Sequence, residues 1–185
     1  MPVSDHPTAP KIIALTGFMA AGKSTVGRAL AGLLHWQFVD LDSEIERVDG
    51  QTIRQIFERR GEAGFRSLES ETLRAILAGT KRAAVIALGG GAFVQPKNAA
   101  LLADGGASVV FLEVPLEQLL QRCRALSERC QDNPRPLAED EEAFCRLYDR
   151  RLPSYRRANL VVDAAEKTPE EIAGEIAKAF RLHLG

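Results

Sequence analysis

Short apolar runs alternate with longer segments of mixed polarity along most of this 185-residue chain. Five of the runs are compact and β-rich, and most end at Gly, Asp or Pro: residues 11–17, 37–42, 83–90, 107–114 and 159–164. The segments between them have helical composition, notably residues 24–34, 65–79 and 116–126. Continuous apolar strands separated by helices predict an α/β fold whose parallel sheet is covered on both faces.

The last helical segment, residues 168–184, carries clear start signals. Thr168 is suited to be the N-cap and Pro169 the first helical residue. Glu170 and Glu171 then place negative charge at the positive end of the helix dipole. These signals predict that a helix closes the domain.

Two stretches depart from the alternation. Residues 43–80 hold only helical segments, which predicts a small subdomain beside the sheet. Residues 122–140 are polar, charged and interrupted by Pro134 and Pro136, a composition typical of a mobile lid or of an ordinary surface loop. We therefore expect one domain over residues 11–183. A flexible lead-in at residues 1–10 precedes it, with three prolines and no apolar core of a signal peptide.

Composition narrows the classes of partner. With 45% hydrophobic and 26% charged residues and a formal net charge of −1, the chain resembles an ordinary globular protein. Nothing in that charge favours nucleic acid or an anionic membrane. The three cysteines, Cys123, Cys130 and Cys145, lack paired spacing, which argues against a disulfide framework or a zinc site. We expect a cytoplasmic protein, and nothing demands more than a monomer.

The stretch "GFMAAGKST" (residues 17–25) matches the phosphate-binding pattern G-x-x-x-x-G-K-[ST], after a strand and at the start of a helix. Its glycines let successive backbone N–H groups point at phosphate oxygens, and the helix N-terminus adds a positive dipole end. Lys23 supplies a full charge at the β- and γ-phosphates, and Ser24 offers a hydroxyl to Mg²⁺. The predicted nucleotide-binding residues here are Gly17, Ala20, Ala21, Gly22, Lys23, Ser24 and Thr25.

Asp40 and Asp42 stand at the end of the second apolar run, in "QFVDLDSEIE". On an extended backbone, residues two apart leave the same face, so both carboxylates would point the same way. Asp40 is suited to hold Mg²⁺ through its waters. Asp42 is suited to accept a hydrogen bond, or the proton, from a substrate hydroxyl. The alternative is that one of them only caps the next helix.

Further motifs follow in a fixed order: "GEAGFRSLE", "ALGGGAF", "NPRPL" and "RRLPSY". Together with the phosphate-binding loop, this succession resembles the shikimate kinase family from about residue 12 to residue 180. The resemblance implies a nucleoside-monophosphate-kinase-like P-loop NTPase fold, three-layer α/β/α, with a five-stranded parallel sheet in the order 2-3-1-4-5. It also implies Mg²⁺-dependent transfer of the ATP γ-phosphoryl group to the 3-hydroxyl of shikimate, in chorismate and aromatic amino-acid biosynthesis.

The resemblance also assigns roles by position. Arg66 and Arg151 would hold the shikimate carboxylate, with Glu69 orienting Arg66. Asp42 would bind the reacting hydroxyl as candidate base, and Asp40 and Ser24 would serve the metal. Lys23 and Arg135 would meet the phosphates, with Arg135 carried by the lid over residues 122–140. The remaining matches are Gly89, Gly90 and Gly91 beside the substrate and Arg122 against the adenine.

Other interpretations stay open at this point. Arginines are often surface ion-pairing residues, and three glycines after a strand often form only a tight turn. Another small-molecule P-loop kinase, such as a gluconate kinase, is the nearest alternative, because gluconate also carries a carboxylate and hydroxyls. A nucleoside-monophosphate kinase would bring a phosphate against Asp42. A non-catalytic nucleotide-binding regulator is disfavoured because Lys23, Asp42 and Arg135 are all present.

Overall fold

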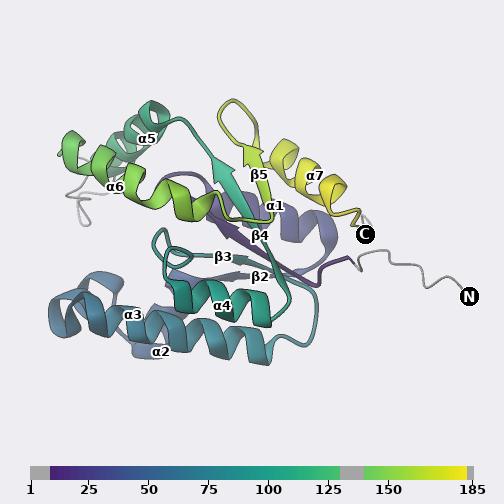
Figure 1. Cartoon of the computed structure of the whole chain (residues 1–185), viewed down its shortest axis with the longest axis horizontal. Coiled ribbons are helices and arrows are strands. Elements are labelled where there is room, and N and C mark those ends of the chain that lie inside the picture. The colour runs from purple at the N-terminus through teal and green to yellow at the C-terminus, as the bar shows by residue number, and fades with distance from the viewer. Residues whose placement is uncertain (1–8, 130–139, 183–185) are drawn as a thin grey trace, which may run out of the picture.

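The computed structural model describes residues 9–129 and 140–182. Its centre is a five-stranded sheet in the order β2-β3-β1-β4-β5, with every neighbouring pair parallel (Figure 1). The strands are Ile12–Thr16 (β1), Gln37–Asp40 (β2), Ala84–Ala87 (β3), Ala107–Glu113 (β4) and Leu160–Asp163 (β5). The predicted parallel sheet and its strand order are both confirmed.

Helices cover both faces of the sheet (Figure 1). The layer that shares the larger core cluster holds Lys23–Leu34 (α1), Leu116–Arg129 (α5), Glu141–Tyr155 (α6) and Pro169–Ala179 (α7). The opposite layer holds Leu41–Asp49 (α2), Ile53–Gly79 (α3) and Pro96–Asp104 (α4). This is the three-layer α/β/α arrangement.

Strand β1 shows why these strands carry no alternation of polarity. Ile13 and Leu15 belong to the core cluster on one face, and Ile12 and Ala14 belong to the cluster on the other. Successive side chains of a strand point to opposite faces, and here both faces are buried under helices. Every residue of β1 is therefore buried, and all of them except Thr16 are apolar.

Several local features refine the sequence-based expectations. Thr168 is the N-cap of α7, as predicted, and it also forms a complete capping box with Glu171. Helix α3 is broken at Gly61, whose φ of 65° is left-handed and favours glycine. Helix α5 continues to Arg129, so the first part of the expected lid, residues 122–129, is helical. The rest of that segment up to residue 139 lies outside the described residues.

Within residues 9–129 and 140–182, no helix is both long and apolar enough to cross a membrane.

Candidate active site

The phosphate-binding loop connects β1 to α1 and has an unusual backbone. Gly17, Ala20 and Gly22 all have positive φ, at 149°, 62° and 89°. The Lys23 Nζ donates hydrogen bonds to the carbonyl oxygens of Gly17 at 3.0 Å and Phe18 at 2.9 Å. The loop therefore folds around the lysine at the N-terminus of α1, where backbone N–H groups and the helix dipole favour an anion.

Ala20 has a φ of 62°, a left-handed conformation that glycine adopts without strain and alanine does not. A left-handed conformation costs a residue with a Cβ about 1–2 kcal/mol. The loop thus carries local backbone strain at a residue that lines the cavity beside it.

The relation between the two aspartates also differs from the prediction. Strand β2 ends at Asp40, and Asp42 lies in the first turn of α2, so the two do not project from one face of an extended strand. Asp40 is the N-cap of α2, accepting from the Ser43 N–H at 3.3 Å. Its other oxygen accepts from the Ser24 hydroxyl at 2.5 Å. Asp40 therefore caps a helix and also faces the phosphate-binding loop.

Asp42 lies among charged groups from four elements, β2, α1, α2 and α3. Burial raises the pKa of its carboxyl group, while Lys23 and, more weakly, Arg66 lower it; Asp40 and Glu46 raise it further. Behind it stands Gly89, where a Cβ atom would lie 2.6 Å from Asp42 Oδ1. Only glycine lets the backbone after β3 approach this carboxylate so closely.

Arg66 and Glu69 form an ion pair on α3, three residues apart. Arg66 Nη1 donates to both carboxylate oxygens of Glu69 at 3.0 Å, and Glu69 is only 1% exposed. Burial raises the pKa of Glu69, whereas Arg66 lowers it. A Cβ atom on Gly91 would lie 2.7 Å from Arg66 Nη2, so the glycine turn also runs against this guanidinium.

Arg151 approaches the same turn from α6. A Cβ on Gly90 would lie 3.7 Å from Arg151 Nη1, and the Arg151 guanidinium also lies 5.9 Å from the centre of the Phe18 ring. The buried hydroxyl of Tyr155 donates a short hydrogen bond to the Gly90 carbonyl. Tyr155, the last residue of "RRLPSY", thus links α6 to the glycine turn.

A cavity of about 460 Å³ extends from the phosphate-binding loop towards α5 and α7. Its size suits a small-molecule site. Arg122 lies in its wall, where Nη2 donates to the Ala165 carbonyl at 2.9 Å. The lining is otherwise mostly apolar: Ala20, Ala21, Gly22, Thr25, Val26, Ala125, Leu126, Ala164, Lys167, Pro169 and Ile172. Arg122 and residues of the phosphate-binding loop therefore line the same cavity.

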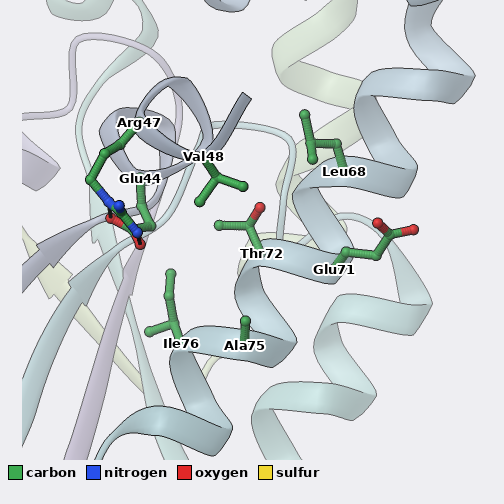
Figure 2. Close-up of a pocket in the computed structure, with 8 residues that line it drawn as sticks. All are labelled: Glu44, Arg47, Val48, Leu68, Glu71, Thr72, Ala75 and Ile76. Atoms are coloured by element: carbon green, nitrogen blue, oxygen red, sulfur yellow. Dashed lines mark hydrogen bonds and ion pairs between the residues drawn. The ribbon is translucent and has the colours of Figure 1, made fainter. Parts of the chain in front are cut away.

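A second cavity, of about 380 Å³, lies between α2 and α3 (Figure 2). The Glu44–Arg47 ion pair stands on one side and the α3 residues Leu68, Thr72 and Ile76 on the other (Figure 2). None of the predicted site residues lines it. It is therefore separate from the charged cluster around Asp42.

Comparison with known proteins points to one family. A family model described as "Shikimate kinase" matches residues 19–181. The chain is 41% identical over 180 residues to a shikimate kinase of Geobacter sulfurreducens, covering 96% of this chain and 94% of that one. The chain belongs to the shikimate kinase family.

Further relatives agree with that family. A shikimate kinase of Parasynechococcus marenigrum is 44% identical over 165 residues, which cover 88% of this chain and 82% of the relative. Among solved structures, shikimate kinase from Acinetobacter baumannii in complex with shikimate is 38% identical and superimposes with a TM-score of 0.80, covering 94% of each chain. The solved structures also share the P-loop NTPase fold predicted from the sequence.

Members of the shikimate kinase family use ATP, in general with Mg²⁺. Among the described residues, no group of three or more His, Cys, Asp or Glu side chains is placed to hold a metal. A magnesium ion carried by ATP needs no such cage, because it keeps several waters and takes few protein oxygens. The adjacent oxygens of Ser24 and Asp40 fit that requirement.

The structure brings most of the predicted site residues of this shikimate kinase family member to one edge of the sheet. Lys23 and Arg66 both lower the pKa of the Asp42 carboxyl group, and Arg66 and Arg151 both lower that of Glu69. Arg135 lies outside the described residues. Besides Tyr155, sequence reasoning also missed the buried Asn98 of α4, which no periodicity or motif marks.

Proposed function

We propose that this protein transfers the γ-phosphoryl group of ATP to the 3-hydroxyl of shikimate, giving shikimate 3-phosphate and ADP. The observation that carries the proposal is the position of Asp42 beside the Arg66–Glu69 pair: a Cβ atom on Gly89 would lie 2.6 Å from Asp42 Oδ1 and 3.4 Å from Glu69 Oε1. The charges of Lys23 and Arg66 lower the pKa of its carboxyl group, against the effect of burial. Asp42 as a base, Lys23 as a cation for phosphate and Arg66 as a cation for carboxylate together suit the phosphorylation of a small acid that carries hydroxyl groups. Family membership gives that acid its identity.

The loop and α1 would bind the triphosphate. Backbone N–H groups at the start of α1 and the Lys23 ammonium neutralise the β- and γ-phosphates. Ser24 and Asp40 would hold Mg²⁺, which when bound neutralises charge on the transferring group. The adenine of ATP would occupy the cavity that Arg122 lines.

Arg66 and Arg151 would bind the substrate carboxylate. A guanidinium can donate two parallel hydrogen bonds to a carboxylate, which fixes the acid in orientation as well as position. Glu69 holds one nitrogen of Arg66, Nη1, in place. With the acid end held, the ring directs a hydroxyl towards Asp42.

Asp42 would accept the proton of the 3-hydroxyl. As that O–H bond breaks, the hydroxyl oxygen forms a bond to the γ-phosphorus and the bond from phosphorus to the bridging oxygen breaks, releasing ADP. Burial raises the pKa of Asp42, which makes it a stronger base than an exposed aspartate, while Lys23 keeps its charged form accessible. Arg135 would complete the site from the lid.

The deciding experiment measures ADP release with ATP, Mg²⁺ and either shikimate or gluconate, and identifies the product. We expect turnover with shikimate alone, yielding the 3-phosphate. Asp42→Asn should lose most turnover, on the order of 10²-fold or more, while ATP binding stays largely intact. Normal turnover in that variant would refute the role of Asp42, and turnover with gluconate alone would refute the substrate.

We also propose that the protein acts on these small molecules in the cytoplasm as a monomer, with neither nucleic acid nor a membrane as partner. The net charge of −1 and cysteines without paired spacing support this setting. Size-exclusion chromatography with light scattering would test the oligomeric state.

A further inference from the structure

Asn98, the third residue of α4, is a polar side chain in an unusual place. It is 0% exposed, although the exposed positions Pro96 and Lys97 stand just before it. Its Nδ2 donates to the Ala92 carbonyl at 3.1 Å and to Glu69 Oε2 at 3.4 Å. Its Oδ1 is buried and has no hydrogen-bond partner among the described residues. Burying an amide that is only partly satisfied destabilises the fold, so packing alone does not account for it.

The partner of Asn98 explains what the amide contributes. Glu69 is itself almost fully buried, and a buried carboxylate needs hydrogen bonds on both oxygens. Arg66 donates to both oxygens, and Asn98 adds a donor to Oε2. The amide supplies this hydrogen bond without adding charge.

Other charged groups also act on Glu69. Asp42 raises the pKa of its carboxyl group and Arg151 lowers it, in addition to Arg66. Glu62 lies on the far side of Arg66, with its carboxylate 3.6 Å from Nη2. A neutral donor at residue 98 preserves the balance of these charges, whereas a carboxylate there would not.

The second contact of Asn98 fastens the glycine turn. The Ala92 N–H donates to the Gly89 carbonyl at 3.0 Å, which closes the turn, and the Ala92 carbonyl accepts from Asn98. Gly91 lies against the Arg66 guanidinium. One side chain therefore holds both Glu69 behind Arg66 and the backbone beside Arg66.

We propose that Asn98 is a positioning residue of the substrate-carboxylate site, acting through Glu69 and Ala92 to fix the guanidinium of Arg66. The inference rests on the proposed function, in which Arg66 binds the carboxylate of the substrate. It predicts that changes at Asn98 affect shikimate more than ATP.

The sharpest test is Asn98→Asp, because aspartate has nearly the same shape as asparagine but its side chain can lose a proton. At acid pH the new carboxyl group shares a proton with Glu69 and donates a hydrogen bond as the amide does. At alkaline pH two carboxylates repel each other in one buried site. We expect kcat/KM for shikimate, relative to the wild type, to fall by about tenfold or more between about pH 6 and pH 9, with KM for ATP changing less than about twofold.

Lys97→Gln is the matched control, because it makes the same change of charge at the exposed neighbouring position of α4. It should keep the wild-type pH profile. If Asn98→Asp unfolds, Asn98→Leu carries the test, since it removes the donor and buries no new charge. It should raise KM for shikimate by about tenfold and leave KM for ATP unchanged.

A wild-type pH profile in Asn98→Asp overturns the inference, as do equal changes in KM for shikimate and for ATP in Asn98→Leu. Arg66→Lys in the same assay separates this failure from a failure of the proposed function. If Arg66→Lys raises KM for shikimate and the Asn98 variants do not, only the role of Asn98 is wrong. If Arg66→Lys leaves KM for shikimate unchanged, the carboxylate site itself is wrong.

Discussion

Replacing Gly91 by alanine should displace Arg66 without unfolding the protein. The new Cβ would lie 2.7 Å from Arg66 Nη2, 2.9 Å from Nη1 and 3.0 Å from Cζ. An ordinary contact of this kind begins at 3.4 Å, so Nη2 must retreat by about 0.7 Å, the difference from 2.7 Å. The guanidinium is the far end of a flexible side chain, so the side chain moves and the backbone of the turn stays.

The magnitude follows from the interaction that is lost. A hydrogen bond to a charged group contributes about 1.5–3 kcal/mol, which corresponds to roughly 10- to 150-fold in an equilibrium constant. We therefore expect kcat/KM for shikimate to fall by about 10- to 100-fold, mostly through KM. KM for ATP should change little, because the three atoms nearest to the new Cβ all belong to Arg66.

Steady-state kinetics with each substrate tests the expected rise in KM for shikimate, and thermal unfolding tests whether the variant stays folded. Gly79→Ala at the exposed end of α3 is the matched control, because its Cβ would meet nothing within 4 Å. In the double variant Gly91→Ala/Arg66→Lys, kcat/KM for shikimate should be only slightly lower than in Arg66→Lys alone, since the two changes act through one contact. A wild-type KM for shikimate in Gly91→Ala, or an equal loss in Gly79→Ala, would refute the reasoning.

Three further predictions concern the backbone and the tyrosines. Ala20→Gly should remove the strain of a left-handed alanine and raise the free energy of unfolding by about 0.5–1 kcal/mol. In thermal unfolding, each kcal/mol corresponds to a rise in Tm of about 2–4 °C. Ala75→Gly, in the regular part of α3, should instead lower the free energy of unfolding. Tyr155→Phe removes the donor to the Gly90 carbonyl and should cost about 1–3 kcal/mol in denaturant unfolding and raise KM for shikimate; unchanged values would assign Tyr155 to packing alone. Burial raises the pKa of Tyr155 to about 12, and burial also raises the pKa of Tyr148, the other tyrosine of the chain. Because the folded-state pKa of Tyr155 exceeds the unfolded value of about 10, its stabilising effect is complete below about pH 10 and is lost as the pH rises towards about 12. In a Tyr148→Phe background, phenolate absorbance should therefore appear together with unfolding, and a separate phenolate step of the folded protein would contradict this.

Much of the fold could be predicted from local sequence. The five apolar runs became the five strands within a few residues, and Thr168 caps α7 as its signals predict. These features depend on properties of neighbouring residues: burial on both faces of a strand, and a hydroxyl that satisfies the first N–H groups of a helix. The phosphate-binding loop is equally local, because its glycines, Lys23 and Ser24 are consecutive or nearly so.

Local reasoning failed where a short element ends. Asp40 and Asp42 fit an extended strand by spacing, yet α2 begins between them because Asp40 caps it. The positive φ of Ala20 could not be predicted either, since alanine gives no sign that it will adopt it. In both cases the surrounding structure determines the local conformation against the local preference.

The sequence by itself determined the chemistry available to this protein: a phosphate-binding loop, acidic side chains at a strand end, and arginines within motifs of the shikimate kinase family. Only the tertiary structure decided which of these meet. Arg66 and Arg151 come from α3 and α6, helices on opposite faces of the sheet, and the glycine turn after β3 lies between them. Asn98 and Tyr155 could be recognised only there, because the partners of a buried polar group are chosen by packing and not by distance along the chain.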